Sequence, residues 1–258
     1  MAEKVALVTG AGSGIGRAAA LKLAEDGFAV GVLGHTPEEN HETAKAIREN
    51  GGTALELVAD VTSDDELQAA FDTLSAEHGR LDVVVANAGI NGVWAPIDEL
   101  APDEFDKTIT VNLRGTFLTI RAAVPHLKRA GGGSIVVISS INGTRTFTSP
   151  GATAYSATKA AQLAIVQQLA AELGQHRIRI NAICPGTIDT EIDDNTDIRH
   201  PEKSGVRAEW PNGSVPLTDG KPGTSVQVAN VIAFLASNQS DHITGSPIWV
   251  DGGQSLLR

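Results

Sequence analysis

Short apolar segments rich in β-branched residues alternate along the chain with longer segments of helical periodicity. Most of the short segments are apolar at every position, as expected for strands buried on both faces of a sheet. The repeated strand-helix-strand order predicts an α/β fold, a doubly wound parallel sheet of about seven strands with helices on both faces. The predicted strands are Val5–Thr9, Ala29–Leu33, Ala54–Val58, Leu81–Ala86, Ser134–Ile138, Arg179–Ala182 and Ile248–Val250, and the helices begin near Gly14, Pro37, Asp64, Asp103, Thr153 and Ser225.

The length of 258 residues suits one α/β domain, and the chain has no internal repeat, low-complexity tract or linker that would divide it. We therefore expect a single domain over residues 1–258. The regular alternation stops at residues 190–223, a segment rich in Asp, Asn, Pro and Gly. A loop of this length inside a domain is typical of a lid, so we predict that it covers a substrate.

The lid segment also carries several cations and a tryptophan. They either recognise an acidic or polyhydroxylated substrate or form the charged, solvated surface of the lid, and we favour the second interpretation. The residues are Arg199, His200, Lys203, Arg207 and Trp210.

Composition argues against several classes of function. A net charge of −11 disfavours a nucleic-acid partner, because binding to phosphate backbones needs an excess of Lys and Arg. Cys184 is the only cysteine and cannot form an internal disulfide, which indicates a reducing, cytoplasmic location. No pair of histidines has i, i+4 spacing, so we expect no metal. No apolar run approaches the roughly 20 residues of a membrane helix, and the start of the chain has no signal-peptide pattern.

A glycine-rich turn, Thr9-Gly-Ala-Gly-Ser-Gly-Ile-Gly16, follows the first predicted strand and opens the first helix. Glycines there let the backbone turn sharply and approach a pyrophosphate, while the helix N-terminus favours the negative charge. A turn that binds nothing is the alternative. The strand before the turn and the helix after it favour a nucleotide site of the Rossmann type.

The end of the second strand lacks the acid that usually binds the adenosine ribose, since it reads Val32-Leu-Gly-His35-Thr36. Without a carboxylate, a 2′-phosphate would not be repelled, and His35 with Thr36 could donate to one. The pattern therefore favours NADP over NAD, with a solvated His35 as the alternative.

Tyr155 and Lys159 share one face of a predicted helix, because they are four residues apart. Tyr155 is the only tyrosine of the chain. A free phenol has a pKa of about 10, and a neighbouring ammonium lowers it by favouring the phenolate. Such a pair could exchange a proton with a carbonyl or alcohol oxygen during hydride transfer, although an ordinary surface pair has the same spacing.

Polar residues stand where other predicted strands end. Ser139 and Ser140 follow one strand and Asn87-Ala88-Gly89 follows another, and open α/β sheets bind ligands at this edge. Asn112 lies inside the predicted helix Asp103–Ala130 although Asn is a poor helix former. It could distort the helix and hold a water, or it could simply face solvent.

Together these residues resemble the short-chain dehydrogenase/reductase family in its single-domain form, over essentially the whole chain. The glycine turn is similar to the family's cofactor motif, Asp60 to its adenine-contacting Asp, and Asn87-Ala88-Gly89 to its sheet-stabilising turn. Val250-Asp-Gly-Gly253 resembles its last strand and exit. The residues that the resemblance assigns to the cofactor, NAD(P)(H), are Gly10, Ser13, Gly14, Ile15, Gly16, His35, Asp60, Val61, Asn87, Ala88, Gly89, Tyr155, Lys159, Pro185, Gly186, Thr187, Ile188 and Thr190.

The resemblance implies four catalytic residues. Ser140 would orient and polarise the substrate oxygen, and Tyr155 would give or take its proton. Lys159 would bind the nicotinamide ribose and lower the pKa of the tyrosine, and Asn112 would position a water that relays protons to Lys159. Ser140 fits the family's Ser-x-x-Gly pattern better than Ser139, and both assignments stay open. The interval from Ser140 to Tyr155 is slightly long, so residues 144–152 could reshape the pocket.

The leading function is an oxidoreductase that transfers hydride between NAD(P) and a small carbonyl or alcohol substrate. A catalytically silent NAD(P)-binding regulator would be expected to lose Tyr, Lys or Ser, and none is missing here. An epimerase or dehydratase with the same Tyr-Lys pair would have a different glycine spacing and a larger C-terminal region. Trp94 is either a wall of the pocket or packing.

The resemblance also implies a homotetramer or homodimer. The expected interfaces are the helices Asp103–Ala130 and Thr153–Gly174 and the C-terminal strand. Ile248-Trp249-Val250 would leave an apolar sheet edge, and such edges are usually paired or buried.

Overall fold

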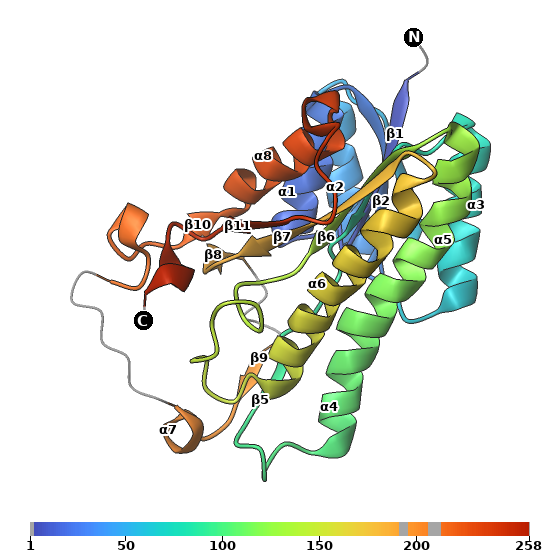
Figure 1. Cartoon of the computed structure of the whole chain (residues 1–258). Helices are drawn as coiled ribbons and strands as arrows, with labels where there is room; N and C mark the ends of the chain where they lie inside the picture. Colours follow the sequence, from blue (N-terminus) through green and yellow to red (C-terminus); the bar gives the residue numbers. More distant parts are fainter. Residues whose placement is uncertain (1–2, 191–195, 206–212, 258) are drawn as a thin grey trace.

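The chain folds around a parallel sheet with helices on both faces (Figure 1). A computed structural model describes residues 3–190, 196–205 and 213–257. Among these residues the central sheet has seven strands, which confirms the predicted doubly wound α/β class. From edge to edge its strands are β11 (Pro247–Val250), β7 (Ile178–Pro185), β6 (Gly133–Ile138), β4 (Val83–Ala86), β1 (Lys4–Thr9), β2 (Phe28–Gly34) and β3 (Ala54–Val58), and every neighbouring pair is parallel.

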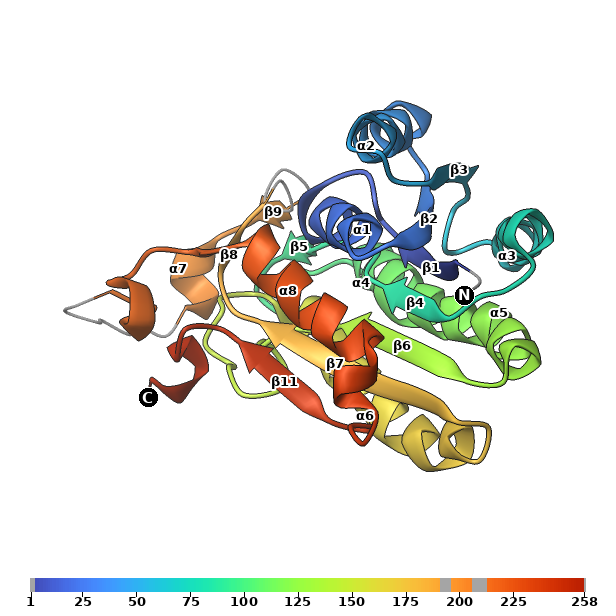
Figure 2. The ribbon, with the colours of Figure 1, turned by 90° about the horizontal axis from the view of Figure 1, so that it is seen from above.

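The helices form a layer on each face of the sheet, as the view from above shows (Figure 2). None of the helices in the described part of the chain is long and apolar enough to cross a membrane. One layer is α1 (Gly14–Glu25), α2 (Pro37–Glu49) and α8 (Ser225–Ala236), and the other is α3 (Asp64–His78), α5 (Gly115–Ala130) and α6 (Thr153–Gly174).

Each layer has its own apolar core against the sheet. Leu23 and Ile232 belong to the core beneath α1, α2 and α8, and Phe71 and Leu173 belong to the core beneath α3, α5 and α6. All four side chains are fully buried, and each such burial stabilises the fold by about 1.5–3 kcal/mol. The sheet is therefore a rigid platform whose carboxyl edge can position functional groups.

The helix predicted over Asp103–Ala130 is interrupted. It begins as α4 (Pro102–Thr108), continues as the π-helical segment Ile109–Arg114 and returns to α geometry in α5. Asn112 lies in the π-helical segment and is completely buried, so a solvent-facing Asn112 is wrong. Such π segments are often found at functional sites.

Short elements that the sequence pattern did not predict lie beyond the sheet. Strand β5 (Gly92–Trp94) pairs with β9 (Thr196–Ile198), and β8 (Ile188–Asp189) pairs with β10 (Gly223–Thr224). The segment 190–223 therefore contains regular structure, including helix α7 (Pro201–Ser204). Arg207 and Trp210 lie outside the described residues.

Candidate active site

The glycine-rich turn joins β1 to α1 in a conformation that needs glycine at two positions. Gly10 and Gly14 have φ of +62° and +50°, in the left-handed region that side chains disfavour. A Cβ at Gly16 would lie 1.9 Å from the carbonyl oxygen of Gly10 and 2.5 Å from Asn87. The turn is thus packed tightly on its inner side, while the side chain of Ser13, just before α1, is exposed.

Asn87 holds the turn against the end of β4. Its Nδ2 donates to the carbonyl oxygens of Thr9 at 3.0 Å and Gly10 at 3.2 Å. The hydroxyl of Thr9 in turn accepts from the backbone N–H groups of Asn87 at 3.0 Å and Ala88 at 3.1 Å. This double link fixes Asn87-Ala88-Gly89 beside the glycine turn, where the resemblance places the cofactor.

Other residues assigned to the cofactor follow neighbouring strands at the same edge. His35 is exposed after β2, and the exposed Asp60 accepts from the backbone N–H of Thr62 at 2.8 Å. Val61 is buried next to Gly115. A Cβ added to Gly115 would lie 2.9 Å from the Val61 side chain. Ile15 is half-buried at the start of α1.

The segment after β7 is held by the C-terminal residues. Gly186 donates from its backbone N–H to Val250 at 3.0 Å, and Thr187 donates to Gln254 at 2.7 Å. Pro185 is buried, and Ile188 enters the short ladder with β10. Thr190 is half-buried at the end of this segment.

These residues fit a dinucleotide. The backbone of the turn has no side chain at Gly10, Gly12, Gly14 and Gly16, and the N-terminus of a twelve-residue helix follows it. An anionic pyrophosphate is stabilised by the free N–H groups and the dipole of such a helix end. In the described part of the chain no group of three His, Cys, Asp or Glu side chains is arranged to hold a metal ion.

Ser140 and Tyr155 meet at the carboxyl end of β6. The Tyr155 side chain is buried and forms a hydrogen bond with the hydroxyl of Ser140. The hydroxyl of Ser139 instead donates to the backbone carbonyl of Lys159 at 2.8 Å. Of the two serines, Ser140 is therefore the one beside the phenol, and Ser139 links the strand to α6.

Lys159 lies one helical turn from Tyr155 on the same buried face of α6. Its Nζ donates to the carbonyl oxygen of Ile138 at 2.9 Å and stands 5.4 Å from the centre of the Tyr155 ring. Both side chains are more than nine-tenths buried. The structure thus brings together the three groups that the sequence pattern had only aligned by spacing.

Burial controls the protonation of this pair. It raises the pKa of Tyr155 to about 12, although the hydrogen bond with Ser140 acts in the opposite direction. It also lowers the pKa of Lys159 to about 8, because a buried ammonium loses its hydration. The cost of burying the phenolate is the largest effect on Tyr155, so its pKa lies above that of a free phenol and not below it, as was expected from Lys159.

Asn112 connects the π-helical segment to two neighbours. Its Oδ1 accepts from the backbone N–H of Ile90 at 2.8 Å, and its Nδ2 donates to the carbonyl of Ile90 at 2.9 Å and to Thr158 at 3.2 Å. Its own backbone carbonyl accepts from Thr116 at 2.7 Å and from Gln162 at 2.9 Å. Sequence reasoning missed Thr158 and Gln162, although polar residues on the apolar face of a helix were the available signal.

Trp94 packs beside the phenol, and the residue after it is linked to the loop that follows Ser140. The rings of Trp94 and Tyr155 are 6.0 Å apart, so Trp94 borders the site. The backbone N–H of Ala95 donates to Gly151 in the loop 144–152 at 3.3 Å. A Cβ at Gly143 would lie 2.0 Å from a carbonyl of α6, which explains the glycine three residues after Ser140.

Three cations of the cluster predicted in the lid segment, Arg199, His200 and Lys203, are paired with acids. Arg199 contacts Glu104 at 2.7 Å, and both His200 and Lys203 contact Glu99 at 2.5 Å. Such exposed pairs leave little free positive charge for a substrate. The pairing favours the charged, solvated lid over a site for an acidic substrate.

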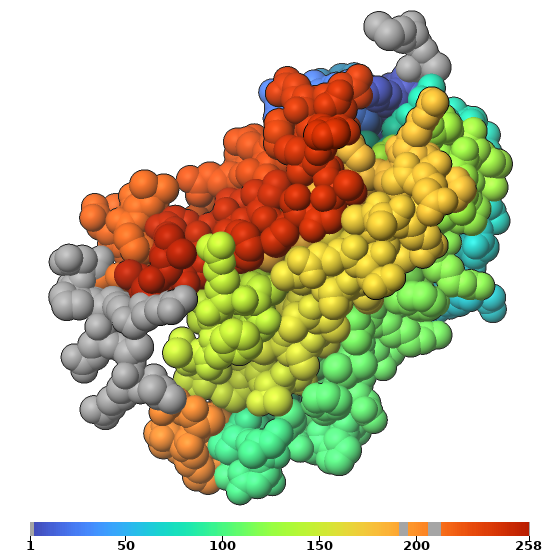
Figure 3. All heavy atoms as spheres, viewed as in Figure 1, coloured from blue at the N-terminus to red at the C-terminus, as the bar shows by residue number. Residues whose placement is uncertain are grey.

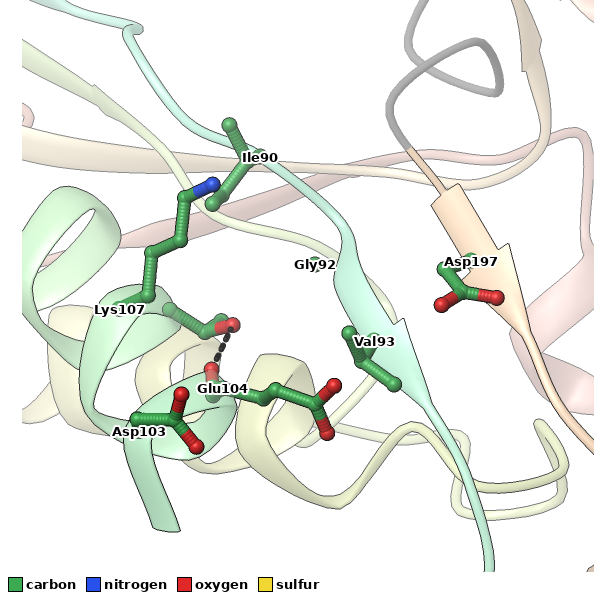
Figure 4. Close-up of a pocket in the computed structure, with 8 residues that line it drawn as sticks. Ile90, Gly92, Val93, Asp103, Glu104, Lys107 and Asp197 are labelled. Atoms are coloured by element: carbon green, nitrogen blue, oxygen red, sulfur yellow. Dashed lines mark hydrogen bonds between the residues drawn. The ribbon is translucent and has the colours of Figure 1, made fainter. Parts of the chain in front are cut away.

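A polar cleft of about 430 Å³ opens between α4 and the β5–β9 ladder (Figure 4). Lys107 reaches toward Ile90, which follows the Asn87-Ala88-Gly89 turn, and Asp197 stands on β9 across the cleft. Ser140, Tyr155 and Lys159 do not line it. The cleft is therefore separate from these three residues.

Comparisons with known proteins cover the whole of this architecture. A family model described as enoyl-(acyl carrier protein) reductase matches residues 10–255. The solved 3-ketoacyl-ACP reductase of Sinorhizobium meliloti 1021 is 61% identical, with a TM-score of 0.94 and coverage of 98% of this chain and 100% of that one. The 3-ketoacyl-(acyl-carrier-protein) reductase of Brucella melitensis, solved with NADH, is 31% identical, with a TM-score of 0.85 and 98% coverage of both chains.

A curated relative widens the range of substrates among these proteins. Cis-4-hydroxycyclohexanecarboxylate dehydrogenase of Sinomonas cyclohexanicum is 39% identical over 99% of this chain and 98% of that protein. The chain belongs to the short-chain dehydrogenase/reductase family. It is an NAD(P)-dependent oxidoreductase that acts on CH–OH or C=O groups of a small molecule, and nothing in the comparisons supports a silent regulator.

Proposed function

We propose that Tyr155 is the general acid–base of the hydride transfer and that Ser140 and Lys159 act with it. The observation that carries this proposal is the buried contact of the Tyr155 and Ser140 hydroxyls at the carboxyl end of β6, one helical turn from the Lys159 ammonium. Substrate oxygen placed between the two hydroxyls would find a donor on each side. General acid–base groups of this kind contribute about 10²–10⁴-fold to a rate.

Each side chain has a separate task. With a pKa of about 12, Tyr155 is protonated at neutral pH and ready to donate to the carbonyl oxygen in the reductive direction. Ser140 holds that oxygen by a hydrogen bond, and in the oxidative direction Tyr155 takes the proton back. NAD(P) would supply or accept the hydride when bound, and the positive charge of its oxidised form would favour the phenolate of Tyr155.

We assign Lys159 to the nicotinamide ribose and Asn112 to positioning. The Asn112 amide joins the Ile90 backbone to Thr158, one residue before Lys159, so it aligns the turn after β4 with the acid–base helix. A relay water at Asn112 stays a prediction. It is supported by the resemblance and not by the contacts of Asn112. The amide and the carbonyl of Asn112 both already have hydrogen-bond partners within the protein.

The first substrate candidate is a 3-oxoacyl thioester, which would be reduced to the 3-hydroxy product. Its support is the name of the relative that is 61% identical over the full chain. A cyclic secondary alcohol that carries a carboxylate is the second candidate, supported by the name of the dehydrogenase from Sinomonas cyclohexanicum. The paired state of the lid cations gives no separate support to the second candidate.

The test is oxidation of NADH and NADPH by the purified protein with a panel of carbonyl compounds. Acetoacetyl thioesters, substituted cyclohexanones, sugars, steroids and quinones would be compared at equal concentration. The proposal expects the highest kcat/KM for the acetoacetyl thioester and a loss of at least 100-fold in Tyr155→Phe. A better substrate from another class would refute the first candidate, and an unaffected Tyr155→Phe would refute the mechanism.

We further propose that residues 190–223 form a lid of the single domain 1–258. Support comes from the backbone N–H of Arg199, which donates to the carbonyl of Trp94 at 2.8 Å, and from the β5–β9 ladder beside it. The lid segment is thereby attached next to the phenol of Tyr155. Strands from residues 4 to 250 share one sheet, which supports one domain.

We propose a homotetramer, with a homodimer as the alternative, in which α5 and α6 form an interface. These two helices lie side by side at the surface (Figure 3). An apolar groove between them is lined by residues that include Phe117, Val124, Ile165 and Leu169, and the Phe117 side chain is 52% exposed. Light scattering after size-exclusion chromatography tests the assembly, and a monomer would contradict it. A cytoplasmic location remains a prediction from the lone, buried Cys184.

A further inference from the structure

A carboxylate lies against the glycine-rich turn although the end of β2 has none. Glu39 belongs to the first turn of α2 and its side chain is exposed. A Cβ added to Gly12 would lie 2.6 Å from both the Cβ and the Oε2 of Glu39. The carboxylate therefore contacts the backbone of the turn on the side that faces α2, four residues beyond His35 in sequence.

Two contacts fix α2 in this position. Asn40, the neighbour of Glu39, is buried, and its Nδ2 donates to the carbonyl oxygens of Gly34 at 3.0 Å and Leu57 at 3.1 Å. Thr43 donates from its hydroxyl to the carbonyl of Gly12 at 3.3 Å. The helix is thus tied both to the ends of β2 and β3 and to the turn itself, with Glu39 between the two attachments.

The charges around this place are mainly negative. Residues 10–16 contain no Lys or Arg, and α2 begins with Glu38 and Glu39. Within the described residues Glu39 is in no ion pair, so its charge is not neutralised by a protein cation. The cationic candidates in the neighbouring segments are Arg17 on the exposed face of α1, the exposed His35, and His41 and Lys45 farther along α2.

We propose that Glu39 binds the adenosine ribose hydroxyls and makes NAD the preferred cofactor. A carboxylate accepts hydrogen bonds from a 2′-hydroxyl, whereas a 2′-phosphate carries a charge of about −1.5 to −2 and is repelled. The proposal rests on the cofactor site at the glycine turn. It reverses the preference for NADP that the missing acid after β2 suggested, because the fold supplies the acid from the next helix.

The test is the affinity for NAD⁺ and NADP⁺, measured by calorimetry without substrate in the wild type and in Glu39→Gln. Gln keeps the size of the side chain and its contact with Gly12 but removes the charge. We expect the wild type to bind NAD⁺ at least tenfold more tightly than NADP⁺, which corresponds to about 1.4 kcal/mol. Glu39→Gln should reduce this ratio at least fivefold, mainly by strengthening NADP⁺ binding.

Glu38→Gln is the matched control, because it removes the same charge from the adjacent position and should change the ratio by less than twofold. Because salt screens exposed charges, the preference of the wild type for NAD⁺ over NADP⁺ should also fall from low to high salt. The preference of Glu39→Gln should not change with salt. Equal or tighter binding of NADP⁺ by the wild type would overturn the proposal, as would an unchanged ratio in Glu39→Gln. A loss of NADP⁺ affinity in His35→Ala would overturn it in favour of His35. Binding of neither dinucleotide would refute the cofactor site as well.

Discussion

The cofactor side and the substrate side of this molecule are built in different ways. Around the glycine turn, short segments next to each strand position the groups, and Asn87 and Thr9 join two adjacent strands of the sheet. On the proposed substrate side the contacts lie outside the central sheet. Asn91 donates to Thr196 at 2.7 Å across 105 residues, and the β5–β9 ladder joins the same segments. The proposed cofactor residues therefore follow the ends of central strands, whereas the proposed substrate side depends on short strands outside the central sheet.

Tyr155→Phe should have the largest effect on turnover, because it removes the hydroxyl that carries the proton and keeps the ring against Trp94. We expect kcat to fall by about 10²–10⁴-fold and dinucleotide affinity to change by less than about twofold. Steady-state kinetics and a calorimetric titration on the same preparation measure the two quantities. If kcat and dinucleotide affinity fell together, Tyr155 would serve cofactor binding as well as proton transfer, which would contradict the division into two sides.

Gly16→Ala should damage the cofactor side as a whole. The new methyl would meet the carbonyl of Gly10 at 1.9 Å, and such overpacking costs about 1–3 kcal/mol of stability. Dinucleotide affinity should fall at least tenfold with it. Gly174→Ala is the control, because nothing lies within 4 Å of that position, and its Tm should not fall. Denaturant unfolding measures the stability and calorimetry measures the dinucleotide affinity. If both values for Gly16→Ala matched those of the control, the prediction would be contradicted.

Lys159 should make dinucleotide binding depend on pH. Its pKa is lowered by burial to about 8, so the ammonium is present below that pH and lost above it. We expect affinity to decline as pH rises through 8, by at most about tenfold per unit for one proton. Lys159→Met should bind more weakly with a flat profile between pH 7 and 9. A flat profile in the wild type would exclude the ribose role of the ammonium.

Asn91→Ala should give the smallest effect and the sharpest separation of the two sides. Asn91 is buried, and its loss would loosen the attachment of β9 beside Trp94. We expect KM for the carbonyl substrate to rise about two- to tenfold, in line with a lost hydrogen bond of about 0.5–1.5 kcal/mol. Dinucleotide affinity should stay unchanged. An equal loss of cofactor affinity would contradict the division of the molecule into two sides.

The parts of the molecule that follow from local pattern could be predicted from the sequence. The seven strands and the turn at Gly10–Gly16 are of this kind, because burial on both faces and glycine spacing are visible in one segment. The short strands β5 and β9 could not be predicted, since three residues carry no periodicity and the pairing is made at long range.

The positions of charged side chains are likewise hard to predict from sequence alone. The sequence reveals that no acid follows β2, but only the packing of α2 on Gly12 shows that Glu39 approaches the turn. Likewise, spacing alone placed Lys159 near Tyr155, whereas the pKa values of both depend on burial that spacing does not report. Sequence reasoning thus proposed the reacting groups, whereas the effect of burial on their pKa values needed the structure.

The most direct measurement is a crystal structure of the protein with NADH and an unreactive analogue of the carbonyl substrate. The account predicts the Tyr155 hydroxyl within hydrogen-bonding distance of the analogue's oxygen, with Ser140 on the other side and the nicotinamide ring next to both. A phenol directed away from the nicotinamide, with no room for a ligand between them, would contradict the account.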